Sequence, residues 1–451
     1  MTKKWLYPLI ILAVLIVLFF LFRPKFGRMS YNQAVALYDS SLFQQSVEKY
    51  NQALWFDDTK AQYFQGKALA LDSLGKYKKA INNYTQAIRL DSSHARNWLY
   101  RGLTFAALEE TGSAIQDFTR VIDMEPEMKD AHYHRGLILL NKKAYDKAIR
   151  DFSRVIELDS TYADAYFKRG ACYREVGEKQ KAVDDYSRAL NLGMDNLNVY
   201  QQRVKALSDV KNYSQAIKDY TRIIELTGGS GKLYYQRGYL HFLLNQYKQA
   251  VPDFTRVLEN DATHRDARYY RAHSYSELSR YDRAMKDFAR VAELDPDDHK
   301  VWFNLGLAKM HLGSFREARQ TLQKATELKE DYDRAYFLLG MTCANLQEHG
   351  NAIQHYSRAI ALDSTYPQAY YYRGVSKGVQ NNHKSAISDY SRAITMDSTF
   401  AMAYYNRGIS KVALNNFGRG CQDFYKALDL GYGEAKKMIQ TYCKNHPKEQ
   451  E

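Results

Sequence analysis

A single pattern of 34 residues recurs twelve times between residues 27 and 434, without an insertion or a deletion. A repeat this short cannot bury its own apolar side chains, so neighbouring copies must stack and share a continuous core. This requirement excludes the separate globular domains that 451 residues would otherwise predict. The copies begin at Gly27, Ala61, Ala95, Lys129, Ala163, Leu197, Gly231, Arg265, His299, Asp333, Pro367 and Ala401.

Within each copy, small and large residues recur at helical spacing. Position 8 is glycine in eight copies, and position 20 is small in all twelve. Positions 4, 11, 17 and 24 are mostly aromatic or aliphatic, so spacings of three, four and seven residues place them on one helical stripe. We expect helix A at positions 1–14, helix B at 15–28 and a turn at 29–34. In the turn, an Asp-Ser-Thr sequence (Asp-Ser-Ser at Ser92) is suited to capping the next helix, at Ser92, Ser160, Ser364 and Ser398.

This order of residues resembles the tetratricopeptide repeat, and the resemblance covers about nine-tenths of the chain. It departs at position 32, where the family favours proline and only Pro126 and Pro296 keep it. The resemblance implies an all-α, right-handed superhelical solenoid of twelve helix-turn-helix repeats. It also implies that protein or peptide segments bind the concave surface lined by helix A.

The N-terminal segment has a different character. Trp5 to Phe22 form an uncharged apolar run of 18 residues, which spans about 27 Å as a helix, close to the hydrocarbon core of a bilayer. We interpret it as an uncleaved transmembrane anchor. A cleaved signal peptide is the alternative, but Arg23-Pro24-Lys25-Phe26 follows the run in place of a small-x-small site. The basic residues on the two sides are nearly balanced, namely Lys3, Lys4, Arg23, Lys25 and Arg28. A short basic tail usually stays in the cytosol, which would place the repeats outside it, in a periplasm if the host is bacterial.

The predicted organisation therefore has seven parts. A joint is expected at residues 226–232, where Gly-Gly-Ser-Gly interrupts the pattern. Pro252 inside helix B and Val204 in place of a small residue predict local irregularity on either side of it. The parts are a tail (1–4), a transmembrane helix (5–22), a linker (23–26), repeats one to six (27–230), repeats seven to twelve (231–432), a capping helix (433–445) and a tail (446–451).

Four cysteines fall into two kinds. Cys172 and Cys343 stand alone in distant repeats and are typical of small core residues. Cys421 and Cys443 each lie eleven residues from Tyr432, on opposite sides, so an antiparallel helix pair would bring them together. We predict either a disulfide that fastens the capping helix, which implies an oxidising compartment, or two packed thiols. A zinc site is not expected, because His446 is the only other ligand nearby.

Arginine at position 7 and aspartate at position 23 occur in the same eight repeats. Pairing each arginine with the preceding repeat fails in three places, so we predict ion pairs within a repeat that join helix A to helix B. A ligand-binding row of arginines is the alternative. The predicted pairs are Arg101–Asp117, Arg135–Asp151, Arg169–Asp185, Arg203–Asp219, Arg237–Asp253, Arg271–Asp287, Arg373–Asp389 and Arg407–Asp423.

Aromatic residues at position 5 are the candidates for a partner-binding groove. They would either anchor a partner segment or pack between neighbouring repeats, and the sequence alone does not decide between the two. They are Tyr133, Phe167, Tyr235, Tyr269, Phe303, Phe337, Tyr371 and Tyr405.

Position 26 is Lys or Arg in ten repeats, which predicts a basic row along helix B. With acids interspersed we interpret the row as a solvated face; nucleic-acid binding is the minority hypothesis. The sequence offers no catalytic motif and no expected cofactor, metal or small-molecule substrate. We therefore expect a non-catalytic, membrane-anchored scaffold or adaptor for proteins. The alternative is an accessory regulatory subunit of a membrane-bound enzyme or of a secretion or assembly complex.

Overall fold

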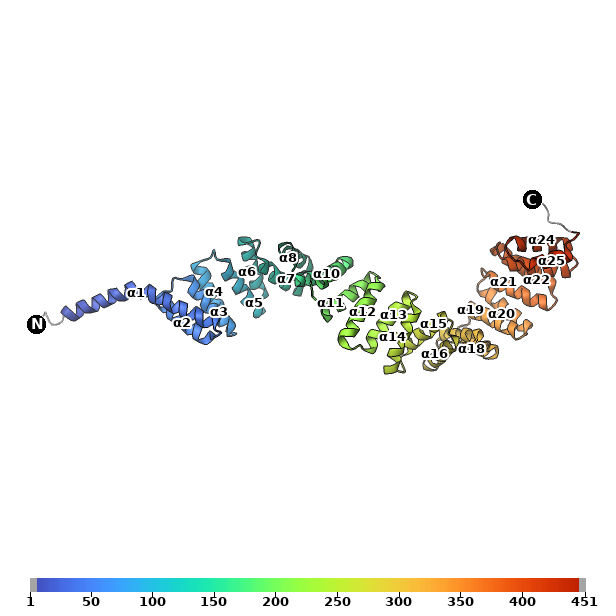
Figure 1. Ribbon diagram of the computed structural model, residues 1–451, viewed down its shortest axis with the longest axis horizontal. Coiled ribbons are helices and arrows are strands. Elements are labelled where there is room, and N and C mark those ends of the chain that lie inside the picture. Colours follow the sequence, from blue (N-terminus) through green and yellow to red (C-terminus); the bar gives the residue numbers. More distant parts are fainter. Residues whose placement is uncertain (1–5, 446–451) are drawn as a thin grey trace. The chain divides into compact units, whose positions relative to one another are not determined.

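The computed structural model describes residues 6–445, and the side chains from residue 10 onward (Figure 1). The predicted tails, Lys3, Lys4, Trp5 and His446 lie outside these residues. Within the described part, the chain forms 25 helices and no strand. Twelve antiparallel helix pairs follow one another along the sequence, and α25 (Ala435–Tyr442) comes last. The predicted all-α array of helix pairs is confirmed.

The chain divides into two compact units, residues 1–223 and 224–451. The division lies inside α12, shortly before Gly228 and Gly229, where the sequence predicts a joint. Helix A of the repeats in the first unit comprises the end of α1 (Leu6–Asp39), then α3 (Ala61–Ser73), α5 (Ala95–Ala107), α7 (Lys129–Asn141), α9 (Ala163–Glu175) and α11 (Leu197–Asp209). Helix B comprises α2 (Phe43–Phe56), α4 (Tyr77–Leu90), α6 (Thr111–Met124), α8 (Tyr145–Leu158), α10 (Lys179–Asn191) and α12 (Tyr213–Thr227).

The second unit repeats the same alternation. Its A helices are α13 (Gly231–Leu243), α15 (Arg265–Glu277), α17 (His299–His311), α19 (Asp333–Asn345), α21 (Pro367–Val379) and α23 (Ala401–Ala413). Its B helices are α14 (Tyr247–Asn260), α16 (Tyr281–Leu294), α18 (Phe315–Leu328), α20 (His349–Leu362), α22 (His383–Met396) and α24 (Phe417–Asp429). Helix α14 runs through Pro252 as one helix.

A left-handed residue at position 15 ends helix A in all twelve repeats, with φ between 56° and 84°. At the end of α7, the N–H of Lys143 donates to the carbonyl of Leu140 (2.9 Å) and the N–H of Ala144 to that of Leu139 (2.8 Å). These two bonds form a Schellman motif, which satisfies the last carbonyls of the helix. Helix B therefore begins at position 17, and the predicted boundary at position 15 is wrong by two residues.

The turn before the next helix A is held by aspartate at position 31. In six repeats this carboxylate accepts bonds from the N–H (2.8–3.0 Å) and the hydroxyl (2.6–2.7 Å) of the Ser or Thr two residues later. The predicted caps Ser92, Ser160, Ser364 and Ser398 are exposed instead. An aspartate turn of this kind competes with a helix cap for the same short side chains, so the capping prediction is wrong.

The small residues let helices A and B of one repeat approach closely. A Cβ added at Gly340 would lie 2.5 Å from the ring of Tyr356, and one at Gly408 would lie 2.6 Å from that of Phe424. The residue at position 20 is fully buried in every repeat, as Ala80 and Gly420 illustrate. Close approach and a buried side chain at position 24, which is aromatic in eleven repeats and Leu322 in the ninth, together make up the core of each helix pair.

Neighbouring repeats are joined more closely on one side than on the other. Within each of the two units, most consecutive A helices touch, as α3 does α5 and α19 does α21. No pair of B helices in the described chain makes comparable contacts. The A helices therefore form the inner side of the local curve, and the B helices form its outer side.

Helix α1 is a single helix of 34 residues, and its last part is helix A of the first repeat. Residues 23–26, expected to be a linker, are helical and include Pro24. Proline has no N–H, so the carbonyl of Phe20 loses its usual partner, but the helix continues. The side chains of residues 10–22 are exposed, and α1 is long and apolar enough to cross a membrane.

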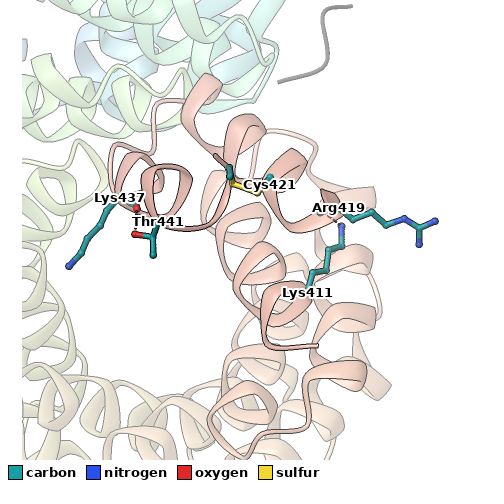
Figure 2. The surroundings of a disulfide bond; sticks show 6 residues. Lys411, Arg419, Cys421, Lys437 and Thr441 are labelled. Carbon is teal, nitrogen blue, oxygen red and sulfur yellow. Dashed lines mark hydrogen bonds between the residues drawn. A yellow bond between two sulfur atoms is a disulfide. The ribbon is translucent and has the colours of Figure 1, made fainter. Parts of the chain in front are cut away.

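At the other end, α25 closes the last helix pair. Ala435 is buried, and Met438 and Ile439 pack on the cluster that includes Phe424. A disulfide joins Cys421 on α24 to Cys443 just after α25 (Figure 2). The helix is shorter than the predicted 433–445, because Gly431 and Gly433 lie in the turn that precedes it.

Candidate binding surface

The structure brings together all eight predicted arginine–aspartate pairs. In each pair Nε and Nη2 of the arginine donate to the two carboxylate oxygens of the aspartate, at 2.5–2.9 Å. Every one of these aspartates is buried, with exposed fractions of 1–5%. The two-bond geometry matches the planar guanidinium to the carboxylate and joins helix A to helix B.

A third partner, which the sequence analysis missed, ties seven of the eight arginines to the preceding repeat. Nη1 donates to the hydroxyl of a Ser or Thr at position 25 of that repeat, at 3.0–3.2 Å. The contacts are Arg101–Thr85, Arg135–Thr119, Arg169–Ser153, Arg203–Ser187, Arg271–Thr255, Arg373–Ser357 and Arg407–Ser391.

The sequence does carry a signal for this third contact. Each arginine at position 7 follows a repeat with Ser or Thr at position 25, and the signal disappears together with the arginine. Asn51, Ala289 and Gln323 stand at position 25 before Lys67, Leu305 and Leu339, respectively. The arginine, the aspartate and the hydroxyl therefore form one unit that spans two repeats, which we call the Arg-Asp-hydroxyl triad.

The electrostatics of the triads leave little charge for a ligand. Burial of Asp151 favours its neutral form, but hydrogen bonds from Arg135 and His132 outweigh burial, so the pKa of Asp151 lies below its ordinary value. The second ring nitrogen of His132 lies 3.1 Å from the carbonyl of Pro126. Since the guanidinium groups have buried carboxylate partners, the structure gives no support to a ligand-binding row of arginines.

The aromatic residues at position 5 lie on helix A but are not free anchors. Phe167, Phe337 and Tyr371 are buried at 7–8% exposure, and the other five are half-buried. In most repeats the ring contacts the aromatic residue at position 24 of helix B, as Tyr405 does Phe424 with centroids 5.9 Å apart. Most also contact the residue that ends the following turn, as Tyr371 does Phe400 at 4.8 Å.

These contacts favour packing between repeats over the partner-anchor interpretation. Burial removes the three buried residues from the candidate groove, because a ring without an exposed face cannot bind a partner segment. The five half-buried residues lie on the A helices, on the inner side of the local curve, and stay candidates: Tyr133, Tyr235, Tyr269, Phe303 and Tyr405.

The basic row at position 26 lies on the outer helices and is partly neutralised. Four of its members pair with an acid three residues later, at 2.5–3.6 Å: Arg154–Glu157, Arg256–Glu259, Arg290–Glu293 and Lys324–Glu327. A cavity of about 450 Å³ opens beside the row, between α6, α7 and α8, and Lys147 and Arg150 line it. Charges already paired with acids make a weak phosphate-binding surface, which disfavours nucleic acid as the partner.

The described residues contain no group of three or more His, Cys, Asp or Glu side chains that could hold a metal ion. The free cysteines Cys172 and Cys343 are buried, and burial raises the pKa of both thiols, that of Cys172 to about 12. A thiol that stays protonated is a poor nucleophile, so both residues serve as small core side chains.

Several proteins of known structure are similar to this chain. YrrB, described as a TPR protein with an unusual peptide-binding site, is 20% identical, covers 42% of this chain and 97% of its own, and has a TM-score of 0.38. The Cut9–Hcn1 hetero-tetramer of APC/C is 14% identical over 93% of this chain and 96% of that one, with a TM-score of 0.40. Yeast Tom70 is 15% identical over 93% of this chain and 96% of its own, with a TM-score of 0.36. No curated protein matches the chain.

Sequence profiles of one family match along most of the chain. Profiles described as tetratricopeptide repeat match residues 130–162, 163–228, 235–299 and 275–340. A profile described as TPR repeat matches residues 68–109 and 342–377. Together with the twelve helix pairs, these matches show that the chain belongs to the tetratricopeptide repeat family.

Proposed function

We propose that this protein is a non-catalytic scaffold that a transmembrane helix holds at a membrane and that binds protein or peptide segments on its A helices. Tetratricopeptide repeats support the scaffold role. The observation that carries the membrane part is the exposed apolar surface of α1, where the side chains of residues 10–22 are all exposed. The ring of Phe19 meets that of Trp55 at the end of this run. Apolar surface of this size needs an apolar surrounding.

The continuity of α1 supports an anchor over a signal peptide. A cleavage after the apolar run would cut inside a helix whose next residues pack on α2, among them Phe26 on Phe56 with ring centroids 5.7 Å apart. Gly27 is also buried against Phe56. A Cβ added at Gly27 would lie 3.2 Å from the Cβ of Phe56. Retention of the segment therefore preserves the first helix pair.

The disulfide supports a position of the repeats outside the cytosol. A link between Cys421 and Cys443 persists where thiols are oxidised and is rare in the cytosol. In the proposed arrangement, the partners are then proteins of the envelope or the cell surface.

One experiment in intact cells tests the anchor and the orientation together. A membrane-impermeant maleimide is added with and without a mild reductant, and the membrane fraction is analysed by intact mass. We expect a full-length chain that takes up label on Cys421 and Cys443 only after reduction. Cys172 and Cys343 stay unlabelled, because they are buried and their thiol pKa values are raised. A chain that lacks its first residues overturns the anchor, and label that appears only after lysis overturns the orientation.

Site-specific photo-crosslinking tests the binding surface. A photoreactive phenylalanine replaces Tyr269 or Tyr405 on the inner side, and in a matched control it replaces Arg392 on the outer helix α22. We expect discrete crosslinked partners from the two inner positions and none from the outer one. Equal crosslinking from both sides would contradict binding on the A helices.

A further inference from the structure

Trp55 differs in character from the residues at the same position of the other eleven repeats. It occupies position 29, near the end of helix B, and 64% of its surface is exposed. In the other eleven repeats position 29 is charged, polar or small: Arg89, Asp123, Glu157, Asn191, Glu225, Glu259, Glu293, Glu327, Ala361, Thr395 and Asp429. The fold of the repeat does not require an aromatic side chain at position 29, so packing within the repeat does not account for this tryptophan.

The end of α2 returns beside the end of the apolar run on α1. Nη2 of Arg23 donates to the carbonyl of Trp55 at 2.9 Å. One helical turn earlier, the ring of Phe19 meets the indole with centroids 5.9 Å apart, edge to face. One turn later, Phe26 meets Phe56. These contacts lie on one stripe of α1 and brace it on both sides of Pro24.

The depth of the indole follows from these contacts. Phe19 precedes Arg23 by four residues, which is about 6 Å along a helix, toward the middle of the apolar run. The indole therefore reaches past the first charged residue to the level of the last apolar turns, with most of its surface uncovered. An amphipathic ring at the end of an apolar span is typical of the interfacial belt of membrane proteins.

We propose that Trp55 is a second membrane contact, with its indole at the boundary between lipid headgroups and acyl chains. This inference rests on the proposed transmembrane anchor and adds a partner surface that belongs to the repeats themselves, namely the phospholipid interface. Lys25 and Arg28 are exposed on the next turn of α1, where they would meet lipid phosphates. The first repeat is thereby fixed against the bilayer by α1 and by the end of α2.

Fluorescence of the full-length protein in vesicles tests this contact. The variant Trp5→Phe, Trp98→Phe, Trp302→Phe keeps Trp55 as the sole tryptophan. It is reconstituted in phosphatidylcholine–phosphatidylglycerol vesicles that carry bromine either near the glycerol end or near the methyl end of the acyl chains. The control variant keeps Trp98 instead, which lies on α5, a helix without notable contact to α1. Flotation of the vesicles reports the anchor separately.

We expect Trp55 to emit at shorter wavelength than Trp98, to be quenched several-fold less by aqueous iodide, and to be quenched most by bromine near the glycerol end. A protein that floats while Trp55 responds to iodide as Trp98 does keeps its anchor and overturns the interfacial contact. Protection from iodide without quenching by bromine also overturns it, because protein, such as a second copy of the chain, then covers the indole. A protein that does not float overturns the anchor and, with it, the contact.

Discussion

The loss of one member of a buried triad should destabilise the chain far more than the loss of two. Arg203 and Asp219 form the most buried arginine–aspartate pair, with side-chain exposures of 10% and 1%. The change Arg203→Leu leaves the carboxylate buried, with only a contact from Nε2 of Gln215 at 3.5 Å. The partner hydroxyl of Ser187 stays satisfied, because it also donates to the carbonyl of Val183 at 2.7 Å. The penalty therefore comes from the lone charge.

The magnitude follows from this burial. An uncompensated buried charge costs about 3–5 kcal/mol, whereas an exposed pair contributes about 0–1 kcal/mol. The double change Arg203→Leu with Asp219→Thr removes the charge as well, and it reproduces the combination that repeat nine carries naturally at Leu305 and Thr321. We expect the double variant to recover most of the loss.

Hydrogen exchange measured by mass spectrometry on the full chain separates the two variants, because it reports local opening of α11 and α12. A loss of about 3–5 kcal/mol accelerates exchange about 10²- to 10⁴-fold for Arg203→Leu. The double variant should exchange close to the unmodified rate, and peptides of the distant α3 and α4 should not change in either variant. If both variants exchange at one rate, or if the single variant stays within about tenfold of the unmodified chain, the pair acts as a surface pair and the reasoning is refuted.

Three further predictions are measured by the same exchange experiment. In Gly340→Ala the new Cβ would lie 2.5 Å from Tyr356, so we expect the free energy of unfolding to fall by about 1–3 kcal/mol. In Gly112→Ala the new Cβ meets open space, so we expect the free energy of unfolding to rise by up to about 1 kcal/mol; equal effects of the two changes would contradict the packing argument. Lys143 has a φ of 59°, which costs a residue with a Cβ about 1 kcal/mol and glycine almost nothing. We expect Lys143→Gly to raise the free energy of unfolding by about that amount, and a decrease would show that the backbone at Lys143 is not strained. Burial raises the pKa of Asp72, so its stabilising contribution is complete below the unfolded pKa and is lost as pH rises through the folded pKa. Asp72→Asn therefore slows exchange at pH 7 and leaves it nearly unchanged near pH 3, and acceleration at pH 7 would contradict this sign.

The helix pairs were predictable because their signal is repeated. Glycine or alanine at position 8 in eleven of the twelve copies, and a small residue at position 20 in all of them, mark the close approach of two helices. The boundary between them was not predictable, because the left-handed residue at position 15 is glycine in only three repeats. Lys143 and Glu109 adopt the same conformation, imposed by the closing of the helix pair and not by a residue preference.

The candidate site was predictable only where two residues vary together. The ion pairs could be inferred because arginine and aspartate are lost in the same repeats. The hydroxyl at position 25 varies in the same way, but it belongs to the preceding repeat and was overlooked. The spacing of Phe167 and Tyr405 places both rings on the same face of helix A but does not predict how far each ring is buried. The burial depends on the residue that ends the next turn.

A tethered scaffold usually owes its client capture to the volume that a flexible linker lets it explore. No such linker separates the apolar run from the first repeat, because α1 continues from one into the other. In the proposed arrangement, the tilt of the membrane helix sets the direction of the first repeat, and rotation about the helix axis selects the face turned to the lipid. Partner binding then depends more on the orientation of the repeats relative to the membrane than on the distance that they can reach from it. Two or three glycines inserted after Pro24 would interrupt α1 and replace the rigid connection by a flexible one, while every residue of the binding surface stays the same.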